Sequence, residues 1–187
     1  MERTRKPLLH RLLSSLMAAS LAGCAFFTPS KEPPHTVDQV DLEAYMGRWY
    51  EIASFPNWFQ KGCVCTTADY RMASGYVEVI NTCRRNSPES PQDKASAKAF
   101  PVEGSGNARL KVQFQWPFKG DYWIIHVDED YRHAVVGHPK RKYLWILARA
   151  PAITSEAFHR LVSVARDKGY PVERLRMTSQ SCFENAP

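Results

Sequence analysis

The chain of 187 residues lacks the features that identify several common classes of protein. After the first 23 residues, no stretch is long and apolar enough to cross a bilayer as a helix, and no internal repeat is present. Lysine and arginine are scattered, so we expect no nucleic-acid partner. His126, His133 and His138 have no spacing that brings three ligands onto one metal ion, and no Ser-His-Asp arrangement is visible. We therefore expect no metal, no cofactor and no enzymatic activity.

Residues 1–23 have the pattern of an export signal. Four basic residues and one acidic residue here account for half of the formal net charge of +6. Residues 12–22 are uncharged and largely apolar, and they form about half the length that a transmembrane helix needs. Residues 21–24, Leu-Ala-Gly-Cys, resemble the bacterial lipobox, in which the signal is cleaved before a cysteine that is then lipidated. The pattern predicts a lipoprotein signal peptide over residues 1–23 and lipidation of Cys24. An ordinary signal peptide that ends near a cysteine is the alternative.

The next segment, residues 24–40, predicts a lipidated cysteine followed by a flexible tether. It contains three prolines and no hydrophobic periodicity. Several acyl chains on Cys24 would anchor the protein stably, whereas a single chain is marginal. Ala25 follows the cysteine, and an aspartate there would favour retention in the inner membrane. We therefore expect a protein anchored to the outer membrane, facing the periplasm, after handling by the lipoprotein export and sorting machinery.

Residues 41–187 have the pattern of one strand-rich domain. Alternation is clearest over residues 110–116, in which apolar and polar side chains occupy opposite faces. A two-residue turn at Ser74 and Gly75 would pair Ala73 with Tyr76. Further strands are expected over residues 48–55, 94–100, 121–127, 134–138 and 143–150. Even spacing and short breaks favour an antiparallel barrel.

One helix is expected near the end of the chain. Thr154 is a candidate N-cap, Gly169 is suited to the C-terminal cap, and a single apolar stripe runs between them along one face. One stripe alone indicates that the helix lies outside the barrel, against the outward face of residues 143–150, before a closing strand over residues 172–178. The predicted fold is all-β: an eight-stranded antiparallel up-and-down barrel with one C-terminal α-helix packed outside.

Three motifs in order resemble the lipocalin family. They are Gly47-Arg48-Trp49 in the first strand, Asp130-Tyr131 in a late turn, and Arg149 at the end of the eighth strand. Residues 47–53, 131–134 and 143–147 are similar to segments of the bacterial outer-membrane lipoprotein lipocalins and the related apolipoprotein D, and the likeness covers roughly residues 42–178. It implies a barrel open at one end that holds one small apolar ligand. It also implies that Arg149 lies over the indole of Trp49 at the closed end, in a structural role.

Strand parity and this resemblance together give a candidate ligand wall. Both faces of residues 121–127 are apolar enough to point inward, and position matching to the bacterial lipocalins favours the face of Tyr122. A wall of this kind suits an acyl chain or another flat apolar molecule. The alternative is that the same side chains simply fill the barrel. The candidate ligand-binding residues are Tyr70, Val79, Phe114, Trp116, Tyr122, Ile124 and Trp145.

Two segments that are expected at the surface have open interpretations. Trp58 and Phe59 follow the first strand, where they would form a lid, dip into lipid, or tuck into the barrel rim. Residues 140–142, Lys-Arg-Lys, are either a solvated turn or a contact for anionic head groups.

Apart from Cys24, four cysteines remain, an even count that is typical of an oxidising compartment. Cys63 and Cys65 are two residues apart and point the same way, so they do not readily bond to each other. The resemblance to apolipoprotein D, in which the second strand is tied to the C-terminal tail, implies a Cys65–Cys182 disulfide and leaves Cys63–Cys83 as the other pair. A free, redox-active thiol is the alternative.

These expectations combine into a lipid carrier. We predict an outer-membrane lipoprotein that binds a small hydrophobic ligand, a fatty acid or a lysophospholipid, in a barrel cavity; a role in membrane maintenance is what the resemblance implies. The alternatives are a lipocalin-fold enzyme or thiol-redox protein that acts on a lipid, and a structural envelope lipoprotein whose barrel is filled.

Overall fold

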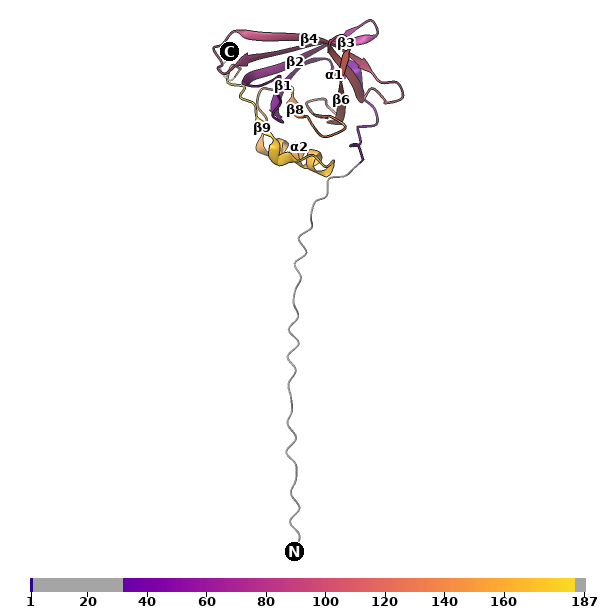
Figure 1. Ribbon diagram of the computed structural model, residues 1–187, viewed down its shortest axis with the longest axis vertical. Coiled ribbons are helices and arrows are strands. Elements are labelled where there is room, and N and C mark those ends of the chain that lie inside the picture. Colours follow the sequence, from indigo (N-terminus) through magenta and orange to yellow (C-terminus); the bar gives the residue numbers. More distant parts are fainter. Residues whose placement is uncertain (2–31, 184–187) are drawn as a thin grey trace.

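The computed structural model describes Met1 and residues 32–183 (Figure 1). The expected signal peptide, Cys24 and the first part of the tether lie outside the described residues. Within the described part of the chain, no helix combines the length and the hydropathy that a membrane span requires.

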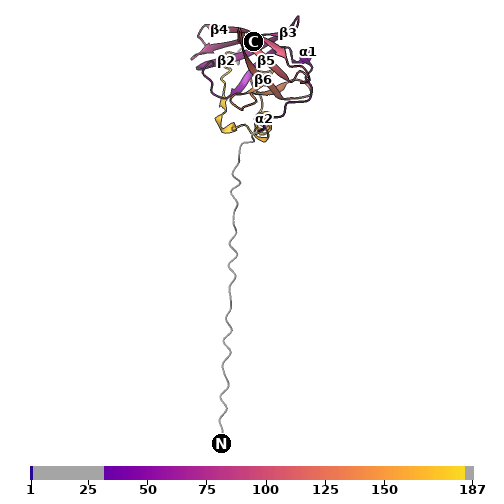
Figure 2. The same ribbon diagram turned by 45° about the vertical axis from the view of Figure 1, so that its right-hand side comes forward.

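The described chain forms one closed sheet and a helix outside it (Figures 1 and 2). Each of β2 to β7 pairs with the next strand, β8 pairs with β1, and β1 also pairs with β2, so that eight antiparallel strands close a ring. The predicted eight-stranded barrel with one outer C-terminal helix is confirmed. In order, the elements are α1 (Leu42–Tyr45), β1 (Gly47–Ser54), β2 (Cys63–Ala73), β3 (Tyr76–Arg85), β4 (Gln92–Pro101), β5 (Arg109–Gln115), β6 (Phe118–Val127), β7 (His133–Gly137), β8 (Leu144–Ala148), α2 (Ser155–Asp167), a 3-10 turn (Val172–Arg174) and β9 (Arg176–Met177).

The connections alternate between the two ends of the barrel. The turns at residues 74–75, 102–108 and 128–132 lie at the end that carries α1, and we call this the closed end. The connections at residues 55–62, 86–91, 116–117 and 138–143 lie at the opposite end, which we call the mouth.

The expected β2–β3 hairpin register is correct. Ala73 pairs with Tyr76 across the two-residue turn, and Tyr70 pairs with Val79 further along. Because side chains alternate along a strand, this register places both Tyr70 and Val79 on the inner face. The turn residues therefore fix which side chains enter the barrel.

Two apolar clusters divide the structure. The inner cluster fills the closed half of the barrel and includes Trp49, Tyr70, Val79 and Ile124. The outer cluster lies between the barrel and α2, with Leu144, Ile146 and Ala148 of β8 facing Leu161 and Ala165. Strand β8 is therefore apolar on both faces, as the sequence predicts for the strand beneath the helix.

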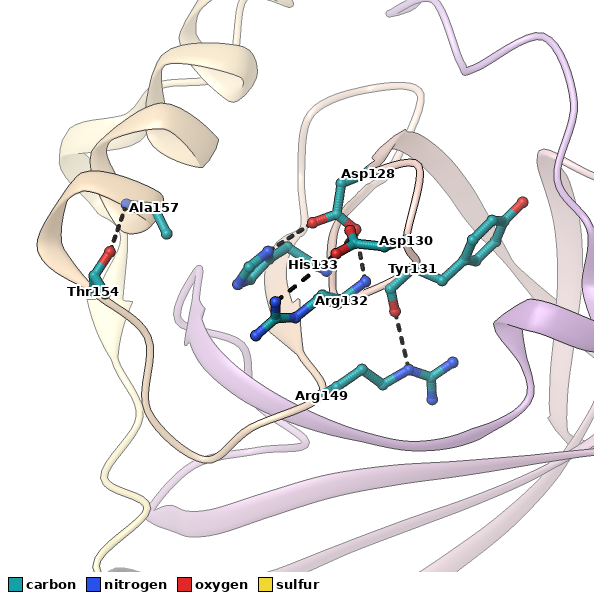
Figure 3. A network of polar contacts seen from close by, with 8 residues as sticks. All are labelled: Asp128, Asp130, Tyr131, Arg132, His133, Arg149, Thr154 and Ala157. Carbon is teal, nitrogen blue, oxygen red and sulfur yellow. Dashed lines mark hydrogen bonds and ion pairs between the residues drawn. The ribbon is translucent and has the colours of Figure 1, made fainter.

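Helix α2 has the expected caps. The hydroxyl of Thr154 accepts a hydrogen bond of 3.2 Å from the backbone N–H of Ala157, which satisfies one of the unpaired donors of the first turn (Figure 3). At the other end Gly169 has a φ of +78°, in the left-handed region that glycine adopts without steric cost.

The expected strand over residues 172–178 is wrong for most of its length. The segment begins with a 3-10 turn, and only Arg176 and Met177 pair with β1. Pro171 precedes the 3-10 turn, and its ring restricts the backbone φ angle at that position. Beyond Met177, the tail lies along the edge of β1 without forming a regular ladder of hydrogen bonds. The short helix α1 was also not expected. Asp41 caps it by accepting from the N–H groups of Glu43 and Ala44, and four residues are too few to show a helical period.

Candidate ligand site

The closed end is sealed by Trp49 and Arg149. The Trp49 side chain is fully buried, and the Arg149 guanidinium carbon lies 3.9 Å from its ring centroid. The guanidinium donates three hydrogen bonds to the carbonyls of Tyr131, Arg48 and Ala44, at 3.1, 2.8 and 2.8 Å (the first is drawn in Figure 3). Arg149 therefore ties three segments of the chain together beneath the indole, the arrangement that the sequence resemblance implied.

The backbone conformation at the start of β1 favours glycine at position 47. Gly47 has a φ of +91°, a region that residues with a Cβ atom rarely adopt, so any other residue there would be strained. A Cβ atom built on it would lie 3.4 Å from Nη1 of Arg149, an ordinary contact distance.

The turn at residues 128–132 is held by Asp128. Its carboxylate accepts from the backbone N–H groups of Arg132 and His133, and His133 Nδ1 lies 2.7 Å from Oδ2 (Figure 3). Burial by itself would raise the pKa of Asp128, but these hydrogen bonds outweigh it and lower the pKa. His133 thus has a structural partner at the closed end.

Three tyrosine hydroxyls meet on the floor of the barrel, above Trp49. The Tyr122 hydroxyl lies 2.9 Å from that of Tyr45 and 2.9 Å from that of Tyr70. Burial raises the pKa of Tyr45 and of Tyr122 well above the usual value, and it raises the pKa of Tyr70 to about 12. All three hydroxyls therefore keep their protons at physiological pH. We call Tyr45, Tyr70 and Tyr122 the tyrosine triad.

Five of the seven candidate wall residues lie on the inner face. Tyr70, Val79 and Ile124 are buried in the inner cluster, whereas Tyr122 and Trp145 pack against it and remain partly exposed. The choice of the Tyr122 face was correct, since the opposite face of β6, with Trp123 and Ile125, packs in the outer cluster.

Phe114 and Trp116 are not enclosed. Their exposed fractions are 54% and 82%, and they lie where β5 turns into β6 near the mouth. The β5–β6 register shifts between Val112 and Gln115, so the inward alternation that begins at Leu110 does not continue past Val112. The assignment of these two side chains to the enclosed wall is corrected accordingly.

A buried acid that the sequence analysis did not select lies in the barrel wall. Glu51 is only 5% exposed, and its carboxylate accepts hydrogen bonds from Ser54, Thr178 and Gln60 at 2.9, 2.6 and 2.6 Å. The amide oxygen of Gln60 in turn accepts from Trp145 Nε1 at 3.0 Å. Glu51 is two residues beyond Trp49 on β1, so strand parity alone would have indicated its inward direction.

This network attaches the β1–β2 loop to the barrel, while the aromatic side chains of the loop turn outward. Trp58 is 82% exposed and stacks edge-on against Phe59, which also contacts the ring of Tyr143. Of the basic run at the mouth, Lys140 and Lys142 are exposed, and Arg141 donates to the carbonyls of Lys168 and Glu32.

The C-terminal tail completes the wall between β1 and β2. These strands pair only as far as Tyr50, and beyond it the Gln180 side chain donates to the carbonyls of Glu51 and Thr66, at 2.7 and 2.9 Å. Disulfides join Cys65 to Cys182 and Cys63 to Cys83, the pairs that the resemblance implied.

Comparison with known proteins identifies the family. A family model described as a lipocalin-like domain matches residues 40–180. The chain belongs to the lipocalin family. It is 36% identical over 174 residues to the outer membrane lipoprotein Blc of Escherichia coli K12, covering 91% of this chain and 98% of that protein. It is also 40% identical over 160 residues to temperature-induced lipocalin-1 of Arabidopsis thaliana, covering 81% and 85%.

Similarity extends to more distant proteins. Mouse apolipoprotein D is 28% identical over 197 residues, covering 89% of this chain and 94% of that protein. Among solved structures, insecticyanin from the tobacco hornworm Manduca sexta superposes with a TM-score of 0.65 at 17% identity, covering 83% and 89%.

Two surface grooves flank the barrel of this lipocalin. One, of about 700 Å³, lies between residues 32–37, β6 and the end of α2, and the other, of about 300 Å³, lies between the start of α2 and the tail. Neither groove is lined by residues of the candidate wall.

Proposed function

We propose that this lipocalin binds and carries one lipid, a fatty acid or a lysophospholipid, with its acyl chain inside the barrel. The observation that carries the proposal is the partial exposure of Tyr122 and Trp145, which face inward. Incomplete burial of these two inward-facing residues favours an interior that is not completely filled between the tyrosine triad and the mouth. Ala68 also packs against the inner cluster and is partly exposed.

The chemistry of the wall supports an acyl chain. Apart from the triad hydroxyls and the Glu51 network, the inner cluster consists of aliphatic and aromatic groups. Burial of each methylene contributes about 0.8 kcal/mol, so that ten buried methylenes contribute about 8 kcal/mol before the cost of association. Apolar walls discriminate weakly between chain lengths.

The proposal includes a non-enzymatic role. All four cysteines of the described chain are in disulfides, which leaves none of them available as a thiol nucleophile. The Asp128–His133 pair is engaged with the backbone of its own turn at the closed end, away from the mouth. Both observations favour a carrier over the lipid-modifying or thiol-redox alternative.

We further propose attachment to the outer membrane through acyl chains on Cys24, with the barrel in the periplasm. The lipobox-like residues 21–24 support this placement, as does the likeness to relatives named outer membrane lipoproteins over nearly their full length. Metabolic labelling with a radioactive fatty acid tests it: the full chain should be labelled in the membrane fraction, and Cys24→Ala should be unlabelled. Equal labelling of both proteins would contradict the lipid anchor.

Binding is tested with delipidated protein. Hexadecanoic acid, a lysophospholipid and haem are titrated in turn. Tryptophan fluorescence reports occupancy because Trp145 faces the proposed binding space between the tyrosine triad and the mouth, which we call the chamber. Saturable binding of one lipid per chain is expected. A protein that takes up none of the probes would instead be the structural lipoprotein with a filled barrel.

A further inference from the structure

The tyrosine triad has one more hydrogen-bond donor than it uses. Each of the three hydroxyls carries one O–H, and the contacts Tyr45–Tyr122 and Tyr122–Tyr70 use two of the three protons. The three hydroxyls have no other hydrogen-bond partner in the described chain. One O–H therefore remains available on the barrel floor, whichever way the two bonds run.

The available proton belongs on Tyr122. Tyr45 and Tyr70 are buried, whereas Tyr122 is the member of the triad that is not fully buried, and its hydroxyl is the one that contacts both others. Its hydroxyl oxygen has two lone pairs, so it can accept from both neighbours and direct its own O–H into the chamber. Two accepted bonds also polarise this O–H and make it a stronger donor.

A cation without a carboxylate partner lies behind the floor. Arg149 makes hydrogen bonds only to backbone carbonyls, and none of the ion pairs within residues 32–183 includes it. A column of rings links it to the triad: Trp49 to Tyr45 at 4.9 Å, Tyr45 to Tyr70 at 5.7 Å and Tyr70 to Tyr122 at 6.2 Å between centroids. Arg149 is itself only partly buried, so its charge adds a screened, long-range attraction for an anion on the floor.

The wall nearer the mouth presents hydrogen-bond acceptors, in contrast to the donor and the positive charge at the floor. Glu51 offers only acceptors there, and the side chains of Ser54, Gln60 and Thr178 already use them. The Trp145 N–H is likewise bonded to Gln60. An anionic head group beside Glu51 would meet these acceptors, and the Thr66 hydroxyl, which is buried without a hydrogen-bond partner, is a neutral donor in the same part of the wall.

We propose that the lipid enters with its carboxylate first, and that the Tyr122 hydroxyl on the closed floor of the barrel binds the carboxylate while the acyl tail points to the mouth. This inference rests on the proposed function, since it concerns the orientation and the head group of the same ligand. It selects free fatty acids over lysophospholipids, because a phosphodiester head group with its substituents is far bulkier than a carboxylate. Tyr122 is the specificity-determining residue, and Tyr45 and Tyr70 position its hydroxyl.

The test compares two ligands and three proteins. The neutral apolar probe N-phenyl-1-naphthylamine measures the chamber, and hexadecanoic acid displaces it. Tyr122→Phe should bind the probe as the unmodified chain does, but hexadecanoate should bind at least about tenfold more weakly, since a hydrogen bond to a charged group is lost. Tyr76→Phe is the matched control, because its hydroxyl lies on the outer face next to Lys98, and it should change neither affinity.

A second measurement uses the unmodified chain. Hexadecanoic acid labelled at the carboxyl carbon is bound, and its NMR signal is followed as the pH is lowered. A carboxylate on the floor should not titrate through its usual acidic range before the protein unfolds, whereas one at the mouth should titrate as it does in water. Normal titration, or an equal loss of probe and hexadecanoate by Tyr122→Phe, would overturn the inference. Absence of binding by either ligand to the unmodified chain would instead contradict the proposed function.

Discussion

Removal of the Cys65–Cys182 disulfide is expected to destabilise the barrel more than removal of Cys63–Cys83. The two bridges join residues separated by 117 and 20 positions. A cross-link lowers the entropy of the unfolded chain in proportion to the logarithm of the loop that it closes. The expected losses in the free energy of unfolding are about 4.9 and about 3.3 kcal/mol, a difference of about 1.6 kcal/mol.

The location of the longer bridge adds to this difference. Beside it, Cys65 donates its backbone N–H to the carbonyl of Ser179 at 2.7 Å, and Gln180 bonds to both strands that the tail joins. Without the bridge, the tail is free to leave this position and expose those backbone groups. The short bridge joins adjacent strands, β2 and β3, which their own ladder holds together in any case.

Urea unfolding of two double variants measures the difference. Each variant lacks one bridge and leaves no free thiol: one combines Cys65→Ala with Cys182→Ala, and the other combines Cys63→Ala with Cys83→Ala. No reductant is used. Equal losses of stability, or a larger loss in the variant that lacks Cys63–Cys83, would show that neither loop length nor tail docking determines the effect.

Three other predictions follow from single residues. Arg149→Lys keeps the charge but not the planar fork that reaches three carbonyls, so it should lower the free energy of unfolding by about 2 kcal/mol in urea. Gln180→Ala leaves two buried carbonyls without a donor and should cost about 2–4 kcal/mol; a loss below about 0.5 kcal/mol would mean that water replaces the amide. Burial lowers the pKa of His126, so the unfolded chain binds more protons than the folded one, and the Tm should fall as the pH drops below the unfolded value of about 6.5. His126→Gln should reduce this slope, and an unchanged slope would assign the effect to other groups.

The sequence specifies the barrel well where local rules apply. Period-two alternation and a two-residue turn determine the β2–β3 register, because a shift by one residue would turn the polar face of β2 into the core. The same reasoning fails at Phe114 and Trp116. A register shift in a ladder reverses the direction of every following side chain, and nothing in the composition of residues 110–116 marks its position.

The polar residues of the interior were harder to predict from the sequence, for a different reason. Glu51 was open to prediction, since it shares the parity of Trp49 on β1. Tyr45 lies in a four-residue helix outside the strand pattern, and Gln60 and Gln180 reach the barrel from a loop and from the tail. Their roles depend on contacts between distant segments, which strand periodicity does not encode.

The two ends of the chamber are held by separate groups of contacts, and this separation bears on the first prediction. The Glu51 carboxylate binds Gln60 of the mouth loop and Thr178 of the tail. Displacement of the tail removes the hydrogen bond from Thr178, so the carboxylate that holds the loop is itself less firmly held. The floor depends on Arg149 and α1, and no hydrogen bond within residues 32–183 joins either of them to the tail. Loss of the Cys65–Cys182 bridge should therefore increase amide hydrogen exchange in residues 55–62 as well as in the tail, while exchange around Tyr45 and Tyr122 stays slow. If the mouth opens while the floor stays intact, the variant should release an acyl chain faster but keep its preference for a carboxylate. The contacts at the mouth would then determine the rate of ligand release, and the contacts at the floor would determine which ligand is bound.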